Sequence, residues 1–93
     1  MNYSTKKYHA FRRYLGNNIR IHREDNGLSQ EQLAEASDLE IEQVQHLENA
    51  IGNPTFNAVF RIACALDIEP HMLMENIYAE DGKVCLSHFS VCD

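Results

Sequence analysis

The stretch LSQEQLAEASDLEIEQVQHLE, residues 28–48, decides the fold that we predict for this chain. It holds two short helical patterns that meet at a turn around Ser37 and Asp38. Ser29, followed three residues later by Gln32, is the pattern of a capping box and marks the start of the first helix. Isolated helices this short are marginal in water. Both therefore need flanking helices to pack on, and together they predict a helix-turn-helix.

The segment before this stretch, residues 5–26, predicts an amphipathic helix. Gly16 interrupts its pattern, so the segment is either one helix or a short leading helix followed by a second one from Leu15. Asn26-Gly27 supplies the stop, because glycine suits the left-handed position after a helix end. The apolar and aromatic side chains of the predicted helix recur at spacings of three and four: Tyr8, Phe11, Leu15 and Ile19.

The segment after this stretch predicts a loop over residues 50–54, two further helices and a tail. Ile51 in the loop is expected to tuck into the core. Thr55 would cap a helix that ends near Leu66. Because apolar residues occupy most of the circumference of this helix, we expect it to be the central buried helix. Pro70 fits the first turn of a last short helix over about residues 70–76.

The C-terminal residues 77–93 are predicted to stand apart from the helical domain. An Asp81-Gly82 turn between β-prone runs favours a short hairpin, with an extended tail as the alternative. We therefore divide the chain into a basic, helical N-terminal extension (1–14), a helix-turn-helix domain (15–76) and a C-terminal tail (77–93). Because a lone hairpin is marginal in water, the tail would pack on the domain or on a second copy, which makes it the predicted dimerisation element.

Charge is distributed unevenly along the chain. Residues 1–23 hold six of the eight basic residues and no acid, whereas residues 24–93 hold all fourteen acids against Arg61 and Lys83. The two parts carry +6 and −12, which gives the net −6 of the whole chain. A balance this acidic argues against a uniformly basic nucleic-acid-binding surface but leaves room for a local basic patch.

Composition and motifs exclude several classes. No apolar run approaches the 18 or so residues of a membrane span, and residues 1–14 have no apolar stretch of a secretory signal. The three cysteines, Cys64, Cys85 and Cys92, do not have the spacing of a disulfide framework or a metal site, which favours a cytoplasmic protein. Cys64 is expected in the core. Neither a phosphate-binding glycine loop nor a zinc-protease motif occurs, so we predict no enzyme, cofactor or metal.

A family pattern is carried by the following residues: Ile19-Arg20, Arg23, the run 27–34, Val44, the run 47–49, Asn53-Pro54 and the run 62–68. With them, residues 15–73 resemble the phage-repressor family of helix-turn-helix proteins, the Cro/Xre type. Four positions depart from the family pattern, with His22, Asp38, Glu40 and Ala50 in place of an aliphatic residue, a glycine, a serine or threonine cap and a glycine. The resemblance implies an all-α, compact bundle of about five helices.

The resemblance also implies a DNA-binding face. The helix after the turn would enter the major groove, and two protomers would pair on a palindromic site. Carried over by position, the groove-facing residues are Glu40, Ile41, Glu42, Gln45 and His46, with Gln30 and Gln43 near the phosphates and Arg20, Arg23 and Asn53 beside them. Glu48 occupies a family position that is expected to make an internal hydrogen bond.

Two functions from different classes follow. The first is a small sequence-specific DNA-binding transcriptional regulator, a repressor that acts as a homodimer on double-stranded DNA. The second is a protein-interaction module of the same fold, an antirepressor or antitoxin-like partner. Glu40 and Glu42 favour the second, because most of the affinity for DNA comes from cationic contacts with phosphate.

Overall fold

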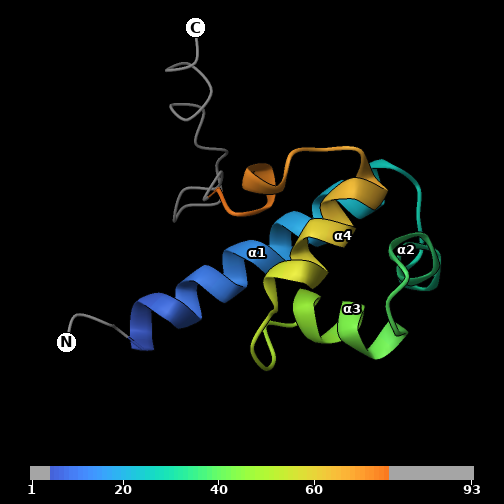
Figure 1. The fold of residues 1–93 in the computed structure, drawn as a ribbon. Helices are drawn as coiled ribbons and strands as arrows, with labels where there is room; N and C mark the ends of the chain where they lie inside the picture. Colours follow the sequence, from blue (N-terminus) through green and yellow to red (C-terminus); the bar gives the residue numbers. More distant parts are fainter. Residues whose placement is uncertain (1–4, 76–93) are drawn as a thin grey trace, which may run out of the picture.

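The computed structural model describes residues 5–75, which form four α-helices and one 3-10 helix and contain no strand (Figure 1). The all-α class and the helix-turn-helix are thereby confirmed. The predicted hairpin lies outside the described residues. The elements are α1 (Thr5–Asp25), α2 (Gln30–Ser37), α3 (Ile41–Glu48), α4 (Phe56–Leu66) and the 3-10 helix η1 (Pro70–Leu73).

A single helix, α1, runs from Thr5 to Asp25 without a break at Gly16. A Cβ atom at Gly16 would lie 2.5 Å from the carbonyl oxygen of Leu47 and 2.7 Å from that of Glu48. Gly16 is therefore the position where α1 crosses the end of α3. The glycine costs about 1 kcal/mol of helix propensity relative to alanine, and the close approach of the two helices depends on it.

The turn between α2 and α3 is built by local hydrogen bonds. At its start, the backbone N–H of Gln32 donates to Ser29 Oγ at 3.0 Å and that of Ser29 to Gln32 Oε1 at 2.8 Å, which confirms the predicted capping box. Asp38 ends α2 in the left-handed conformation, with φ of 59°. Aspartate tolerates this geometry better than most residues, so the turn forms where the family pattern has glycine.

The core lies where α1, α2, α3 and α4 meet, and η1 closes one end of it. Asn18, on the buried side of α1, donates from Nδ2 to the backbone oxygens of Leu73 and Glu75 at 2.8 and 2.6 Å, which holds the end of the described chain against α1. The fully buried apolar side chains come from all five elements and include Leu15, Ile19, Leu33, Val44, Ile62 and Leu73.

The expectation that α4 is the central buried helix is wrong for its outer side. Its inner side buries Val59, Ile62 and Leu66, but Phe56 is 75% exposed and Phe60 48% exposed. Contacts from α2, α1 and η1 reach α4 from the inner side, and no other element among residues 5–75 covers the outer one. Apolarity alone did not tell an inward position from an outward one on this helix.

Two further residues expected in the core are exposed. Cys64 lies on the outer side of α4 with a free thiol. Ile51, 55% exposed, lies in the loop that joins α3 to α4. That loop runs over the surface, and Ala50 and Gly52 turn it with φ of 59° and 75°, so the side chain between them is carried away from the core.

Candidate nucleic-acid interface

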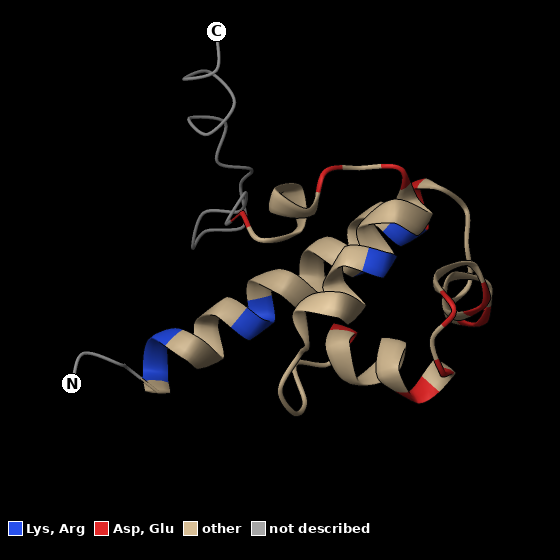
Figure 2. Ribbon diagram, in the orientation of Figure 1, with Lys and Arg blue, Asp and Glu red and all other residues tan. Residues whose placement is uncertain are grey.

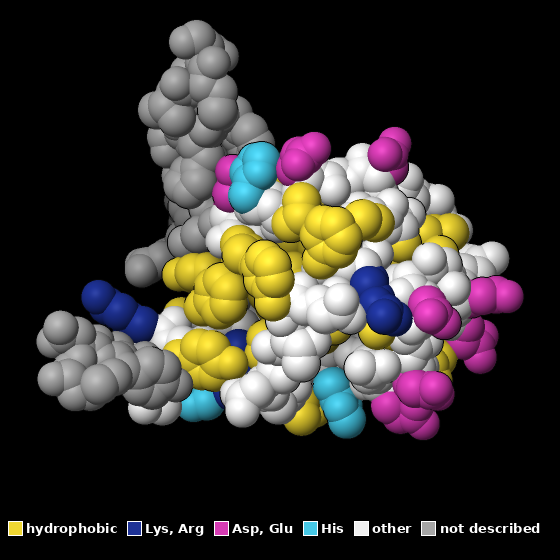
Figure 3. Space-filling view, in the orientation of Figure 1, with side chains coloured by type: hydrophobic (Ala, Val, Ile, Leu, Met, Phe, Trp, Pro, Cys, Tyr) yellow, Lys and Arg dark blue, Asp and Glu magenta, His cyan; other side chains and the backbone are white. Residues whose placement is uncertain are grey.

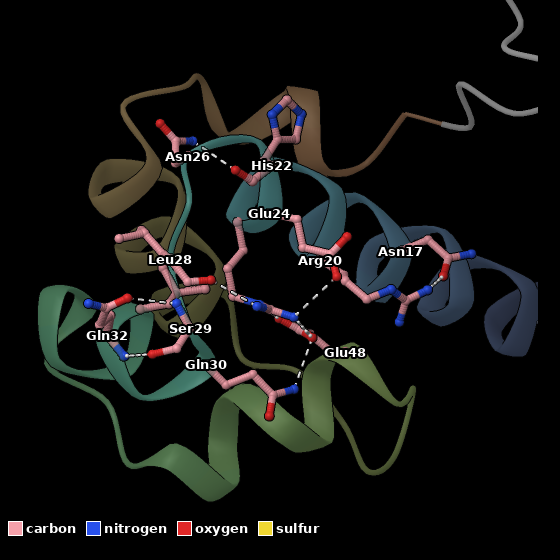
Figure 4. Close-up of polar contacts among 12 residues, drawn as sticks. Asn17, Arg20, His22, Glu24, Asn26, Leu28, Ser29, Gln30, Gln32 and Glu48 are labelled. Atoms are coloured by element: carbon pink, nitrogen blue, oxygen red, sulfur yellow. Dashed lines mark hydrogen bonds and ion pairs between the residues drawn. The ribbon is translucent and has the colours of Figure 1, made fainter.

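Arg23, near the end of α1, forms a two-point ion pair with Glu48, at the end of α3 (Figure 4). Nε donates to Oε2 at 2.6 Å and Nη2 to Oε1 at 3.0 Å, while Nη1 donates to the backbone oxygen of Leu28 at 2.9 Å. The carboxylate is nearly excluded from water, with a side-chain exposure of 1%, and that of Arg23 is 12%. The hydrogen bond to Glu48 is the main reason that the pKa of Arg23 is raised above its ordinary value.

Gln30 completes this network from the first turn of α2. Its Nε2 donates to Glu48 Oε1 at 3.0 Å, so one carboxylate joins α1, α2 and α3 (Figure 4). The internal hydrogen bond predicted for Glu48 is confirmed. Arg23 and Gln30, which the family pattern placed at DNA, use their donors within the fold, and their contact with phosphate stays a prediction. We call Arg23, Gln30 and Glu48 the Glu48 network.

The outward side of α3 presents most of the residues expected in the major groove. Glu40, Glu42, Gln43 and His46 are exposed and Gln45 is half-buried, whereas Ile41 is partly packed against the core. The backbone N–H of Glu40 donates to Gln43 Oε1 at 2.9 Å, which caps the start of α3. The structure thus brings the predicted set to one short helix whose inner side is anchored by Val44 and Leu47.

Charge divides the molecule into a basic helix and an acidic corner. Figure 2 shows Lys and Arg along α1, and Asp and Glu around α2, the turn into α3 and the loop between α4 and η1. Arg61 from α4 also reaches this turn. Its Nη1 donates to the backbone oxygen of Asp38 at 3.0 Å and lies 3.6 Å from the carboxylate. Sequence reasoning missed this pairing, because 23 residues separate the two.

The N-terminal half of α1 holds the loop that follows α3. Tyr8 donates its hydroxyl to Asn53 Oδ1 at 3.0 Å, and Arg12 donates to the backbone oxygen of Gly52. The Arg12 guanidinium also lies 5.2 Å from the centre of the Tyr8 ring, a cation–π contact. The sequence predicted Asn53 in the DNA-binding set, but it did not predict that Tyr8 and Arg12 hold the loop. No spacing along the chain indicates contacts between residues 40 and 45 positions apart.

A shallow hollow of about 140 Å³ separates α3 from this loop. Three residues of the predicted DNA-binding set, Gln43, His46 and Asn53, line it together with Thr55. Arg20 stands apart on α1, half-buried, and donates to Asn17 Oδ1.

Among residues 5–75 no group of histidine, cysteine and acidic side chains is arranged to hold a metal ion, and no helix there is long and apolar enough to cross a membrane.

Residues 19–73 match the model of the helix-turn-helix family HTH_3. The chain belongs to this family. The match covers more than half of the sequence and spans α2, α3, α4 and η1 together with the last third of α1. It confirms the resemblance to Cro/Xre-type proteins, and it includes both the Glu48 network and the exposed side of α3. Membership supports a DNA-binding transcriptional regulator.

Solved structures of other proteins share this HTH_3 fold. The restriction-modification controller protein C.AhdI from Aeromonas hydrophila is 38% identical, with a TM-score of 0.67 over 69% of this chain and 97% of that one. A hypothetical transcription factor, NHTF from Neisseria, is 23% identical, with a TM-score of 0.71 over 87% of this chain and 84% of that one. An HTH_3 family transcriptional regulator from Vibrio cholerae is 20% identical, with a TM-score of 0.67 over 71% of this chain and 37% of that one. None of the curated proteins compared with the chain matches it.

Proposed function

We propose that this protein is a sequence-specific DNA-binding transcriptional regulator that binds a palindromic operator as a homodimer and represses by occupying it. The observation that carries the proposal is the exposed polar side of α3, held onto α1 and α2 by the Glu48 network. A helix that reads bases must keep one orientation relative to the segments that contact phosphate. The buried carboxylate of Glu48 supplies that constraint. The likeness to a controller protein and to transcription regulators supports the same function.

In this proposal α3 reads base edges in the major groove. Gln45 would pair with adenine, His46 would donate to a guanine acceptor, and Glu42 would accept from the amino group of cytosine. Glu40, at the start of α3, would lie beside the base edges, and Ile41 would meet a thymine methyl with the part of its side chain that stays outside the core.

Phosphate contacts would come from α3 itself and from the elements on either side of it. Arg20 on α1 and Gln43 on α3 are donors at the edges of the proposed interface. Because Asn53 Oδ1 accepts from Tyr8, the orientation of its amide is set, and Nδ2 is the donor that it can offer to a phosphate. Arg23 and Gln30 serve the interface by positioning α3, with contact to phosphate as a second role.

The acidic charge of residues 24–93 sets the strength of binding. Glu40 and Glu42 bring negative charge toward the phosphates, and α2 and α3 contain no Lys or Arg. Each phosphate neutralised contributes about −0.9 to the slope of log K against log salt concentration. A protein with few such contacts is expected to bind weakly as a monomer, so the paired half-sites of a dimer supply the affinity.

The test is DNA binding by fluorescence anisotropy across a series of salt concentrations, on the DNA upstream of the coding sequence. We expect a specific complex at low salt that Arg20→Ala weakens and whose salt slope it lowers by about one unit. Arg13→Ala, an exposed cation on α1 outside the matched family region, serves as the control. No complex at any salt concentration, or an Arg20→Ala variant that behaves like the wild type, would refute the proposal.

The acidic corner favours a second candidate, a protein-interaction module that does not bind DNA. Glu31, Glu35, Asp38, Glu40 and Glu42 are all exposed on α2, α3 and the turn between them. Such a surface would engage the basic DNA-binding face of another regulator. Affinity capture from native lysate at low salt tests it: a captured basic protein that Glu40→Lys with Glu42→Lys releases would favour this candidate. Neither candidate assigns a catalytic activity, a metal or a cofactor to the chain, and both imply a cytoplasmic protein.

A further inference from the structure

The outer side of α4 carries aromatic rings into solvent. Phe56 is 75% exposed and Phe60 48% exposed, and Cys64, four residues further along, is exposed as well. Residues four positions apart lie on the same side of a helix, so the three form one line, which we call the α4 row. Soluble monomers rarely expose contiguous apolar surface of this kind unless it is a contact site.

An open groove of about 200 Å³ runs beside the α4 row. Its walls come from α1, from the loop before α4 and from the end of the described chain. Figure 3 shows hydrophobic side chains gathered on this side of the molecule, over α4 and the N-terminal half of α1. Of the two exposed rings, Phe56 lines this groove, and Phe60 continues the α4 row beyond it. The main lining residues are Phe11, Pro54, Phe56, Val59 and Met74.

The α4 row carries no formal charge. The single charged side chain of α4, Arg61, is directed to Asp38 in the turn between α2 and α3. Acidic residues gather around α2 and that turn, and others lie in the loop between α4 and η1 (Figure 2). Two copies of a protein with net charge −6 repel each other at long range. The uncharged α4 row is a part of the described surface where two copies can approach with little repulsion.

We propose that the α4 row and its groove form the interface with a second copy of this chain. A twofold interface uses the same patch on both subunits, so the patch must be complementary to itself. Here a ridge of two rings lies beside an apolar groove, so the rings of one copy can fill the groove of the other. The inference rests on the homodimer of the proposed function and names its interface, which replaces the tail 77–93 as the dimerisation element.

The size of the patch predicts a dimer of moderate strength. Aromatic side chains bury about 150–250 Å² each when fully covered, so the exposed parts of Phe56 and Phe60 supply roughly 250 Å² per protomer. A stable interface of standard size takes about 800 Å² from each partner. The groove walls and the polar rim must supply the rest, and we expect dissociation in the micromolar range, about 1 to 100 µM.

Sedimentation equilibrium of the full chain without DNA tests the interface. We expect the wild type to be dimeric at the upper end of that concentration range. Phe56→Lys combined with Phe60→Lys should weaken association at least about tenfold while the far-ultraviolet circular dichroism stays that of the wild type. Ile51→Lys is the matched control, because Ile51 is also a large exposed side chain, at 55%, but lies in the loop after α3 and not on α4. It should remain dimeric.

Two results would overturn the inference: a wild type that stays monomeric throughout, or a double variant that associates as well as the wild type. If the double variant loses helical signal, Phe56→Ser alone replaces it, since a ring that is 75% exposed contributes little to the fold. Because no DNA is present, the sedimentation result tests the interface separately from DNA binding. A dimer that fails to bind DNA would refute that function, and a monomer that binds an operator would refute the interface.

Discussion

Arg23 and Glu48, 25 residues apart in the sequence, form a nearly water-excluded two-point ion pair that ties the end of α1 to the end of α3. The pair is shared with Gln30 and with the backbone of Leu28. Charges removed from water stabilise a fold only when their hydrogen bonds are satisfied, and the Glu48 carboxylate accepts three here. Arg23, from the basic segment 1–23, thus holds the end of α3 and the start of the α2 region in place.

Removing the Glu48 charge is expected to destabilise the fold strongly. Glu48→Gln leaves the Arg23 guanidinium, 12% exposed, without its counter-charge. Breaking one partner of a buried pair costs about 3–5 kcal/mol, and we expect about 3 kcal/mol in urea-induced unfolding. The double variant Arg23→Gln/Glu48→Gln should lose less than the sum of the two single variants. Additive losses would show that the two side chains do not act as a pair.

Adding a methyl group at Gly16 is expected to push α1 away from α3. Gly16→Ala improves helix propensity by about 1 kcal/mol, but its Cβ would meet backbone oxygens of Leu47 and Glu48 at 2.5 and 2.7 Å. Backbone cannot rotate aside as a side chain can, so we expect a net loss of about 1–3 kcal/mol in thermal or urea unfolding. Arg13→Ala, exposed on the same helix, should change stability by less than about 0.5 kcal/mol. A stabilised Gly16→Ala would contradict the close crossing.

Replacing Ala50 by glycine is expected to raise the free energy of unfolding, although an alanine-to-glycine change usually lowers it. Its φ of 59° places it in the left-handed region, where an L-residue with a Cβ is strained by about 1–2 kcal/mol. Ala50→Gly removes this strain at some entropic cost, so we expect a gain of about 0.5–1 kcal/mol in unfolding free energy. Ala36→Gly, at an exposed position within α2, should lose about as much. If both variants are destabilised, the left-handed turn at Ala50 is refuted.

Tyr8→Phe is expected to loosen the loop after α3 with little effect on global stability. The variant removes the hydrogen bond to Asn53 Oδ1 and keeps the ring under the Arg12 guanidinium. An exposed bond of this kind is worth about 0.5–1 kcal/mol, so amide hydrogen exchange in residues 51–54 should speed up severalfold. Tyr14→Phe removes a hydroxyl from the same helix as a control. Unchanged exchange in the loop would show that α1 does not hold it.

The sequence by itself determined the helical elements and most of their ends, because these depend on local chemistry. Ser29 with Gln32, Thr55 before Phe56, and Gly27 after α1 are signals read over a few residues. The family pattern also located the internal role of Glu48. Only the tertiary structure decided which side of each helix meets another helix, and therefore which residues contact each other. It made Gly16 a crossing point, placed Arg61 on Asp38 and tied Tyr8 to Asn53. It also turned Phe56 and Phe60 outward, because residues 5–75 provide no element to cover that side of α4.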